Sequence, residues 1–450
     1  MNRPIPQHDL LELCQRGVRA ALDAGADQAE VFATSHTESE ASLEKNDLNQ
    51  TRRVEETTFG IRVLKSGSMG FCTSNQASAL TEAAREAVLL AGLSPADENN
   101  GLPSGEALQD AAPAVDPDLL DLGVPELTSL CMELLESTRS QDARLTIDSG
   151  SVSVTHGTQA IASSEGTQAS FEGANAGGYL FGMCVDGEAV GSFSYDGDTV
   201  RNAADLRPRL ESAFSRFVKK CAGAMDAESG ESFRGSIILP PDTVQEFLIG
   251  NLLAMLGADR VRLGQSPFAQ KVGESIASPL FTLVEEGPGL PEFRLAPFDR
   301  EGTPRQRMPL VVDGVLQGFL SNSYEARAAQ SASTGHATGG ASSTPHVGPS
   351  CLSLAGGTTP LDSLSDIERG VLVTRFSGST NPITGDFSGV IKGGFLIRDG
   401  ERTPIEETTM AGNLYDCLKN ISAVSSERRL INGSAYLPAL RIDDVSISAS

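Results

Sequence analysis

The chain contains no tryptophan, few aromatic residues and fewer basic than acidic side chains. Aromatic residues make up 5% and hydrophobic residues 39% of the 450 residues, which is lean but still typical of a globular protein. Lysine and arginine total 35 against 59 aspartate and glutamate residues, so the formal net charge is −24. Because this charge repels phosphate backbones, we expect no direct nucleic-acid binding. The length allows two or three domains.

The sequence also lacks the usual features of exported and membrane proteins. Its N-terminus has no apolar stretch of the signal-peptide kind, and no run approaches the roughly 18 apolar residues of a spanning helix. The seven cysteines are scattered along the chain, and none lies within four positions of another. A dispersed set with an odd number is typical of reduced thiols. We therefore expect a cytoplasmic protein with no membrane association.

Local signatures of several chemistries are missing as well. No histidine is followed by glutamate, so the H-E-x-x-H zinc motif and its longer H-E-x-x-x-H form are absent. The G-x-S-x-G elbow, the G-x-x-x-x-G-K-S/T phosphate loop and the G-x-G-x-x-G fingerprint do not occur either. These absences remove the sequence-local routes to hydrolysis, ATP use and dinucleotide binding. They do not exclude an activity built from distant residues.

The first half of the chain alternates helical and strand patterns. Apolar residues at helical spacing, followed in one case by Gly25 as a stop signal, predict helices over residues 9–24, 77–93, 125–139 and 203–222. The segments between them alternate apolar and polar residues, which predicts strands, with a hairpin turn at Lys65–Ser68. This mixture indicates a domain in which helices accompany a sheet.

The second half is rich in strand patterns separated by glycine turns. It opens with a predicted strand, Ser236–Leu239, and then a helix, Thr243–Leu256, for which Asp242 is the expected cap. Overall we predict an α+β fold in two domains. Residues 1–228 would form a mixed sheet with helices, and residues 229–450 a β-rich, barrel-like domain.

The stretch Asn381–Ile421 has the most distinctive local pattern. Asp399-Gly400 lies between two apolar runs, which is a strong hairpin signal. Apolar residues near helical spacing predict a helix over Met410–Ile421. Two polar residues of this stretch attract attention as well. Asp386 is expected to cap a turn and Asn413 to cap a helix from Leu414, with contact to a substrate or a partner as the alternative for both.

Several segments of the second half resemble one known family. They are the G-D-F-S segment, the strand pair ending in D-G, and P-I-E-E-T-T-M-A-G-N before an apolar helix. The segments Pro297–Gly302 (P-F-D-R-E-G) and Ser333–Ala337 (S-T-G-H-A) add to them. Together they resemble the TldD/PmbA family, and within it the PmbA (TldE) branch. The resemblance implies a two-domain protein of a metallopeptidase group, also known as modulators of DNA gyrase.

The same resemblance implies where a metal site would lie. In the catalytic TldD branch, a helix after a strand like Ser236–Leu239 carries two histidine ligands and a glutamate base, and a distant cysteine completes the site. Here Ile249 and Ala254 fall at the histidine positions, Gly250 at the glutamate position, and Asn432-Gly433-Ser434 where the cysteine is expected. The resemblance therefore implies no metal and no cofactor in this chain, with zinc on a partner.

One loop offers a different location for chemistry. His336, His346 and Cys351 are ligand types within one glycine- and serine-rich segment, although their spacing fits no zinc signature. An ordinary loop is the simpler interpretation. Because His336 belongs to one of the family segments, it is a candidate for contact with a substrate or a partner.

Three functions follow as hypotheses. The first is a subunit, not catalytic alone, that pairs with a TldD-like zinc-bearing homologue in a dimer and presents an unfolded peptide for cleavage or maturation. The second is an independently active peptidase with an unrecognised site, such as the His336 loop. The third is a regulatory binding protein of the gyrase-modulator kind.

Overall fold

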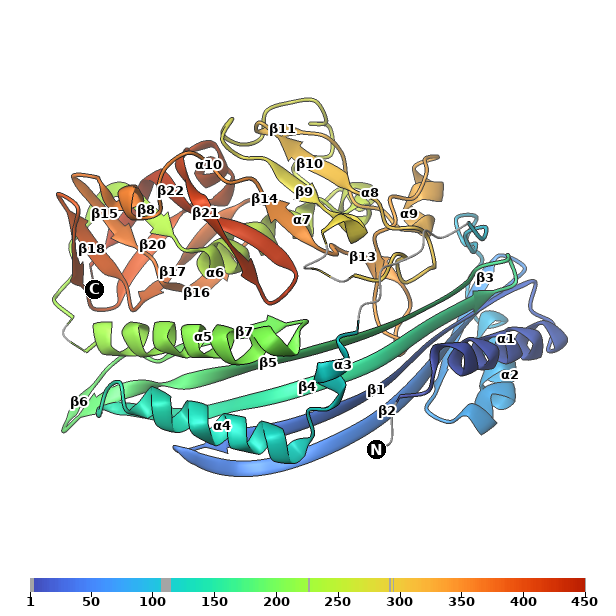
Figure 1. The fold of residues 1–450 in the computed structure, drawn as a ribbon. Helices are drawn as coiled ribbons and strands as arrows, with labels where there is room; N and C mark the ends of the chain where they lie inside the picture. The colour runs from blue at the N-terminus through green and yellow to red at the C-terminus, as the bar shows by residue number, and fades with distance from the viewer. Residues whose placement is uncertain (1–3, 107–114, 226, 291–292, 294, 450) are drawn as a thin grey trace.

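The computed structural model describes residues 4–106, 115–225, 227–290, 293 and 295–449. Figure 1 shows a long, curved N-terminal sheet with the C-terminal domain resting above it. The fold is a mixture of helices and strands in two domains, as predicted. The last helix of the N-terminal domain ends at Gly223, and the first strand of the C-terminal domain begins at Phe233.

The N-terminal sheet is antiparallel throughout and is built from unusually long strands. Its strand order is β3-β2-β1-β4-β5-β6, and β7 pairs with β5. β1 and β4 pair along almost their whole length, from Glu30 opposite Ser163 to Glu44 opposite Ser149. The strands are β1 (Gln28–Glu44), β2 (Asp47–Lys65), β3 (Ser68–Ser74), β4 (Leu145–Ser163), β5 (Gln168–Asp186), β6 (Ala189–Val190) and β7 (Ser194–Val200).

Two pairs of helices cover opposite ends of one face of this sheet. In β1, Val31 packs with α1 and α2, whereas Ala41 packs with α4 and α5. Side chains of a strand that are an even number of positions apart share a face, so both helix pairs lie on the same side. Figure 1 shows them at the two ends of the strands. The helices are α1 (Gln7–Asp23), η1 (Ala77–Ala79), α2 (Leu80–Ala91), α3 (Pro117–Leu120), α4 (Val124–Arg139) and α5 (Ala203–Gly223).

The C-terminal domain contains a branched sheet that is not a closed barrel, which corrects the barrel-like prediction. Its main path runs β11-β10-β9-β14-β22-β8-β15-β18-β19, and β20, β17 and β16 branch from β22, which also pairs with β21. The two ends of the path, β11 and β19, do not pair with each other in the described residues. β11 and β19 each pair with the preceding strand in a hairpin, so the sheet stays open at both ends.

The strands of this domain, several of them short, alternate with brief helices. The strands are β8 (Phe233–Leu239), β9 (Leu283–Glu285), β10 (Met308–Val312), β11 (Val315–Leu316), β12 (Ala337–Thr338), β13 (His346–Val347), β14 (Leu352–Leu354), β15 (Arg369–Leu372), β16 (Arg375–Thr380), β17 (Asp386–Lys392), β18 (Phe395–Arg398), β19 (Glu401–Pro404), β20 (Thr408–Asn413), β21 (Ile421–Ile431) and β22 (Ala435–Ser448). The helices are α6 (Pro241–Thr243), the π-helical turn η2 (Val244–Ile249), α7 (Gly250–Met255), α8 (Ala258–Arg262), η3 (Gly287–Gly289), α9 (Ser323–Ala328), η5 (Asp362–Ser365) and α10 (Leu414–Lys419).

The predicted hairpin at Asp399-Gly400 is confirmed, and the predicted helix over Met410–Ile421 is wrong in its first part. Both hairpin residues have positive φ, and Arg398 pairs with Glu401 across the turn. Residues 408–413 instead form β20, which pairs with β17 and β22. Met410 is fully buried in that sheet. A short apolar run does not by itself distinguish a strand from a helix. Hydrogen bonding to the neighbouring strands β17 and β22 therefore decides the conformation of this segment.

A buried ion cluster joins the two domains on the sheet face opposite the helices. Arg62 of β2 donates to Glu30 of β1 at 2.6 Å and to Glu301 of the C-terminal domain at 2.9 Å. Arg300 donates to the other oxygen of Glu30 at 2.9 Å, and its guanidinium lies 4.1 Å from the centre of the Phe32 ring. All four charged side chains are at most 6% exposed. The cluster is therefore a largely buried connection between the domains.

The segment Pro297–Gly302 supplies the C-terminal half of this cluster. Glu301 also accepts from the backbone N–H and the hydroxyl of Ser323, at 2.8 and 2.7 Å. Asp299 shapes the turn by accepting from three backbone N–H groups, at Glu301, Thr303 and Ala337. Burial, with the nearby charge of Glu301, raises the pKa of Asp299 to about 6. The family segment recognised in the sequence thus serves here as a structural connection.

We predict that Arg62→Met lowers the free energy of unfolding by about 3–5 kcal/mol, because it leaves two buried carboxylates without their shared cation. Denaturant unfolding measures this loss. The matched control is Arg85→Met, because Arg85 is largely exposed and its ion pair, with the likewise exposed Glu82, spans 3.6 Å. An exposed pair of that kind contributes about 0–1 kcal/mol. Similar losses in the two variants would contradict an interdomain connection at Arg62.

Candidate functional site

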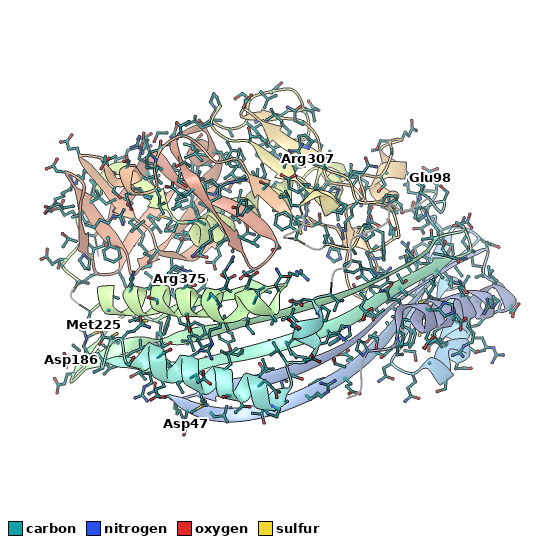
Figure 2. All side chains as sticks on the ribbon, viewed as in Figure 1. Asp47, Glu98, Asp186, Met225, Arg307 and Arg375 are labelled. Atoms are coloured by element: carbon teal, nitrogen blue, oxygen red, sulfur yellow. The ribbon has the colours of Figure 1, made fainter. Side chains whose placement is uncertain are left out.

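A charged cleft of about 310 Å³ lies between the two domains. The N-terminal domain contributes β7 and the adjoining parts of β4 and β5, and the C-terminal domain contributes the start of the α6–η2 helix and the turn between β21 and β22. Figure 2 shows Arg375, a lining residue, between α5 and the strands of the C-terminal domain. The cleft therefore exists only while the two domains keep their relative position.

The wall formed by β7 carries two buried carboxylates. Asp196 and Asp198 are 4% and 6% exposed and lie on the same face of the strand. Helix α5 neutralises them. Asp196 accepts from Arg216 and from Lys220, each at 2.8 Å, and Asp198 accepts from Arg209 at 2.8 and 3.0 Å. Buried charges are retained when they are paired in this way.

The C-terminal wall is connected to the same network. Asp242 pairs with Arg429 and lies 3.8 Å from Lys220, and Arg209 donates to the backbone carbonyl of Leu430 at 3.3 Å. The expected capping by Asp242 is wrong, because the N-cap is Pro240 and no side-chain capping bond forms at this helix start. Arg429 and Lys220 attract the Asp242 carboxylate, so it is not available to the backbone N–H groups at the helix start.

The cleft also contains aromatic and amide groups that are not fully used by the chain. Tyr179 and Tyr195 are 46% and 39% exposed. The Tyr195 hydroxyl donates to Glu246, and burial together with this bond raises the pKa of Tyr195. The carbonyl oxygen of Gln245 is buried and has no hydrogen-bond partner within the described chain. These groups can meet the backbone and side chains of an extended ligand.

Of the positions that the family resemblance assigns to a metal site, Asn432 lines this cleft, and Ile249, Gly250 and Ala254 lie further along the helix that starts at it. Asn432 lies in its wall, in the turn between β21 and β22. Gly250 and Ala254 are exposed positions on the helix, whereas Ile249 is fully buried. Five residues of α-helix rotate a side chain by about 140°, so Ile249 and Ala254 point in different directions. Among the residues that the structure describes, no group of three His, Cys, Asp or Glu side chains is placed to hold a metal ion.

The three candidate ligands of the 336–351 loop differ in their surroundings. His336 is 1% exposed, with Nδ1 2.9 Å from the Thr334 hydroxyl and Nε2 3.6 Å from a Glu285 oxygen. His346 is exposed on β13, opposite Thr338. Cys351 is buried, and desolvation raises the pKa of its thiol to about 12. Substrate or partner contact by His336 stays a prediction.

The structure brings Asp386 and Asn413 together, apart from His336 in the fold. Asn413 accepts from the backbone N–H of Tyr415 at 3.0 Å, so it caps α10 as expected. Its amide donates to Asp386 at 3.0 Å, and Asp386 also accepts from Thr384 at 2.9 Å. These bonds lower the pKa of Asp386. Contact of this pair with a substrate or a partner stays a prediction.

Sequence reasoning missed the charged wall of the cleft. The alternating Asp196-Gly197-Asp198 was a usable signal, because a short run with acids two apart places both on one strand face. The spacing of Arg209, Arg216 and Lys220 puts cations near one side of a helix. Nothing in either segment indicates that they meet Asp242 and Arg429 of the other domain.

The fold and the cleft define a two-domain α+β protein with its candidate site between the domains. Residues 232–449 match the PmbA/TldA metallopeptidase C-terminal domain, and residues 29–91 match PmbA/TldA metallopeptidase domain 1. Together these matches cover more than half of the chain, and it belongs to the PmbA/TldD family. Proteins of this family are named metalloproteases and modulators of DNA gyrase.

Two relatives and two solved structures illustrate the similarity. The Haemophilus influenzae metalloprotease PmbA homologue is 25% identical over 97% of this chain and 96% of its own, and the TldD homologue of that organism is 28% identical over 43% and 44%. TldE from Thermococcus kodakarensis has a TM-score of 0.88 at 25% identity, covering 97% of this chain and all of that one. A Thermotoga maritima protein, described as a proposed modulator of a DNA gyrase, has a TM-score of 0.85 at 20% identity, covering 97% and 99%.

We predict that Asn413→Ala lowers the free energy of unfolding by about 1 kcal/mol, because α10 loses its cap. The same change should raise the pKa of Asp386 toward its usual value, because the largest cause of its lowering is the Asn413 bond. Carboxyl chemical shifts followed by NMR against pH measure the second effect. The control is Ser388→Ala, an exposed change in the same strand. An unchanged Asp386 titration in the Asn413 variant would refute the assignment.

Proposed function

We propose that this chain is the PmbA/TldE-like, non-catalytic subunit of a cytoplasmic metallopeptidase complex whose zinc lies on a TldD-like partner. The complex would degrade small unfolded proteins or mature peptides. The observation that carries the proposal is a charged cleft between the domains together with donor-free residues at three of the positions that the resemblance assigns to the metal. A charged site between the domains is well formed, while the positions expected to hold the metal carry Ile249, Gly250, Ala254 and Asn432.

These residues do not fit a zinc ion. Structural and catalytic zinc sites use cysteine, histidine, aspartate or glutamate donors. Glycine and alanine provide no side-chain donor, and the side chain of Ile249 is apolar and fully buried. Glu246 is the acidic side chain one turn before Gly250, and it is already engaged by Tyr195. We therefore derive no hydrolytic step for this chain alone.

The cleft suits an extended peptide better than a compact small molecule. β7 pairs with β5 on one side, and no other strand of the described chain pairs with it. A peptide strand can add to such an edge through main-chain hydrogen bonds, with side-chain contacts setting preference. Tyr179 and Gln245 supply an aromatic surface and an unused acceptor in the same cleft. Unfolded segments are the substrates that offer a free backbone.

A homologous partner supplies the missing chemistry. The family includes TldD proteins whose sequences align with about two fifths of this chain. Homologous subunits can pair pseudo-symmetrically through equivalent patches. The strongly acidic surface argues against direct DNA contact by this subunit.

The first test assays an unstructured peptide with this chain, with the TldD-like homologue of the same organism, and with the mixture. We expect no cleavage by this chain alone and chelator-sensitive cleavage by the mixture, with co-elution of the two chains. The mixture containing Tyr179→Ala should cleave roughly tenfold less efficiently, as expected for losing one aromatic anchor. Leu93→Ala is the control, because Leu93 is 83% exposed and does not line the cleft. Chelator-sensitive cleavage by this chain alone would refute the proposal.

The second test is elemental analysis of the isolated chain after mild dialysis. We expect far less than one equivalent of zinc, because Ile249, Gly250 and Ala254 have no side-chain donor. Near one equivalent, lost on His336→Ala, would instead favour an independent site in the 336–351 loop. His336→Gln is the companion variant, since it retains a polar side chain that can still reach Thr334 but removes the imidazole.

A further inference from the structure

The N-terminal half of β2 forms an exposed edge of the long sheet. β2 pairs with β1 from Asp47 to Leu64, but with β3 only from Phe59 onward. Along residues 48–58, no other strand of the described chain pairs with the outer side. Asn49–Arg53 are consecutively exposed, which shows that both faces of the sheet are open beside this edge. Figure 1 shows this part of β2 along the rim of the sheet, and Figure 2 places Asp47 at its tip.

The charges along this edge are arranged in a specific order. Arg52 and Arg53 precede Val54, and Glu55 and Glu56 follow it. Alternation along the strand places Arg52, Val54 and Glu56 on one face of the sheet. Arg53 and Glu55 lie on the other face, 3.5 Å apart. Two positive and two negative side chains thus flank a central valine symmetrically, with the signs reversed across it.

This order makes the edge complementary to a second copy of itself. Two edges related by a two-fold axis perpendicular to the sheet run antiparallel and must pair residues from the same face. With Val54 opposite Val54, Arg52 of each copy faces Glu56 of the other, and Arg53 faces Glu55. Such directly opposed charges of unlike sign stabilise strand pairs. All four cross-strand charge pairs are then favourable.

Neighbouring registers lack this property. Moving the centre one residue toward the N-terminus places Arg53 opposite Arg53, and moving it one residue toward the C-terminus places Glu55 opposite Glu55. Like charges directly opposed are destabilising. Charged residues commonly protect sheet edges from pairing with any other strand. For that protection the order of positive and negative residues does not matter. The reversal of sign about Val54 selects one register and one partner.

We propose that residues 48–58 of β2 form a homotypic docking edge, which joins two copies of this chain by antiparallel strand pairing centred on Val54. The pairing extends the N-terminal sheet across both copies. It leaves the cleft between the domains free, because the cleft is lined by β4, β5 and β7 rather than by β2. It is thus a surface distinct from the site of the proposed function.

The test measures self-association of the isolated full chain by sedimentation velocity over a range of concentrations, at low and high salt. The wild type should form dimers that weaken at high salt, because the charge pairs lie at the surface. Arg52→Glu/Arg53→Glu should associate at least tenfold more weakly, and so should Glu55→Arg/Glu56→Arg. An equimolar mixture of these two variants should restore dimers, and a chain with all four changes should again self-associate.

Controls separate pairing from folding. Arg52 contacts Glu38 and Glu40 within the chain, so circular dichroism and thermal unfolding must show that each variant is folded. Arg85→Glu, an exposed change on α2, should leave association unchanged. Amide exchange at residues 48–58 should slow on dimerisation. A wild type that stays monomeric would mean that the charges only protect the edge. Dimers that survive both reversals, or reversed variants that fail to pair with each other, would also overturn the proposal.

Discussion

The arrangement of the two domains depends on the buried cluster of Glu30, Arg62, Glu301 and Arg300. Each charge in it is costly to bury alone, and each is matched by an opposite charge from another segment. Two of the segments are strands of the N-terminal sheet, and one is a loop of the C-terminal domain. These ion pairs can form in only one relative orientation of the domains. The cluster therefore favours that orientation over other orientations that would bury a similar apolar area.

The cleft is the consequence of this orientation at the opposite end of the interface. The apolar contact beside the cluster is small and consists mainly of Phe32, Ile161, Ala296 and Phe298. At the far end, Lys220 of α5 lies 3.8 Å from Asp242, the Tyr195 hydroxyl of β7 donates to Glu246, and Arg209 of α5 donates to the carbonyl of Leu430. Polar groups there are partly paired and partly exposed. A surface of that kind can remain stable while leaving room for a ligand backbone.

The family scaffold persists in this chain although the expected metal donors are replaced. The helix that would carry them is largely a core element, with Val244, Phe247, Leu248 and Leu252 buried. Its burial does not depend on a metal, because these side chains pack within the apolar core of the C-terminal domain.

The sequence by itself determined the elements whose signals are local. The helix 203–222, the hairpin at Asp399-Gly400 and the cap at Asn413 follow from periodicity, backbone preference and side-chain reach over a few residues. The placement of Ile249, Gly250 and Ala254 at metal-site positions stays a prediction, because it rests on the family resemblance. The form of the C-terminal sheet was not readable from local signals. Whether a sheet closes into a barrel depends on which distant strands pair.

Only the tertiary structure decided how the charges are used. Asp242 resembled a cap in the sequence, yet it pairs with Arg429, nearly two hundred residues further along the chain, and lies near Lys220 of the other domain. Residues 410–413 were predicted to be helical, yet they belong to β20, which forms hydrogen-bonded ladders with both β17 and β22. Arg62 and Glu301 carry no local sign that they will meet. Long-range electrostatics and strand pairing depend on positions in space, which local sequence patterns do not encode.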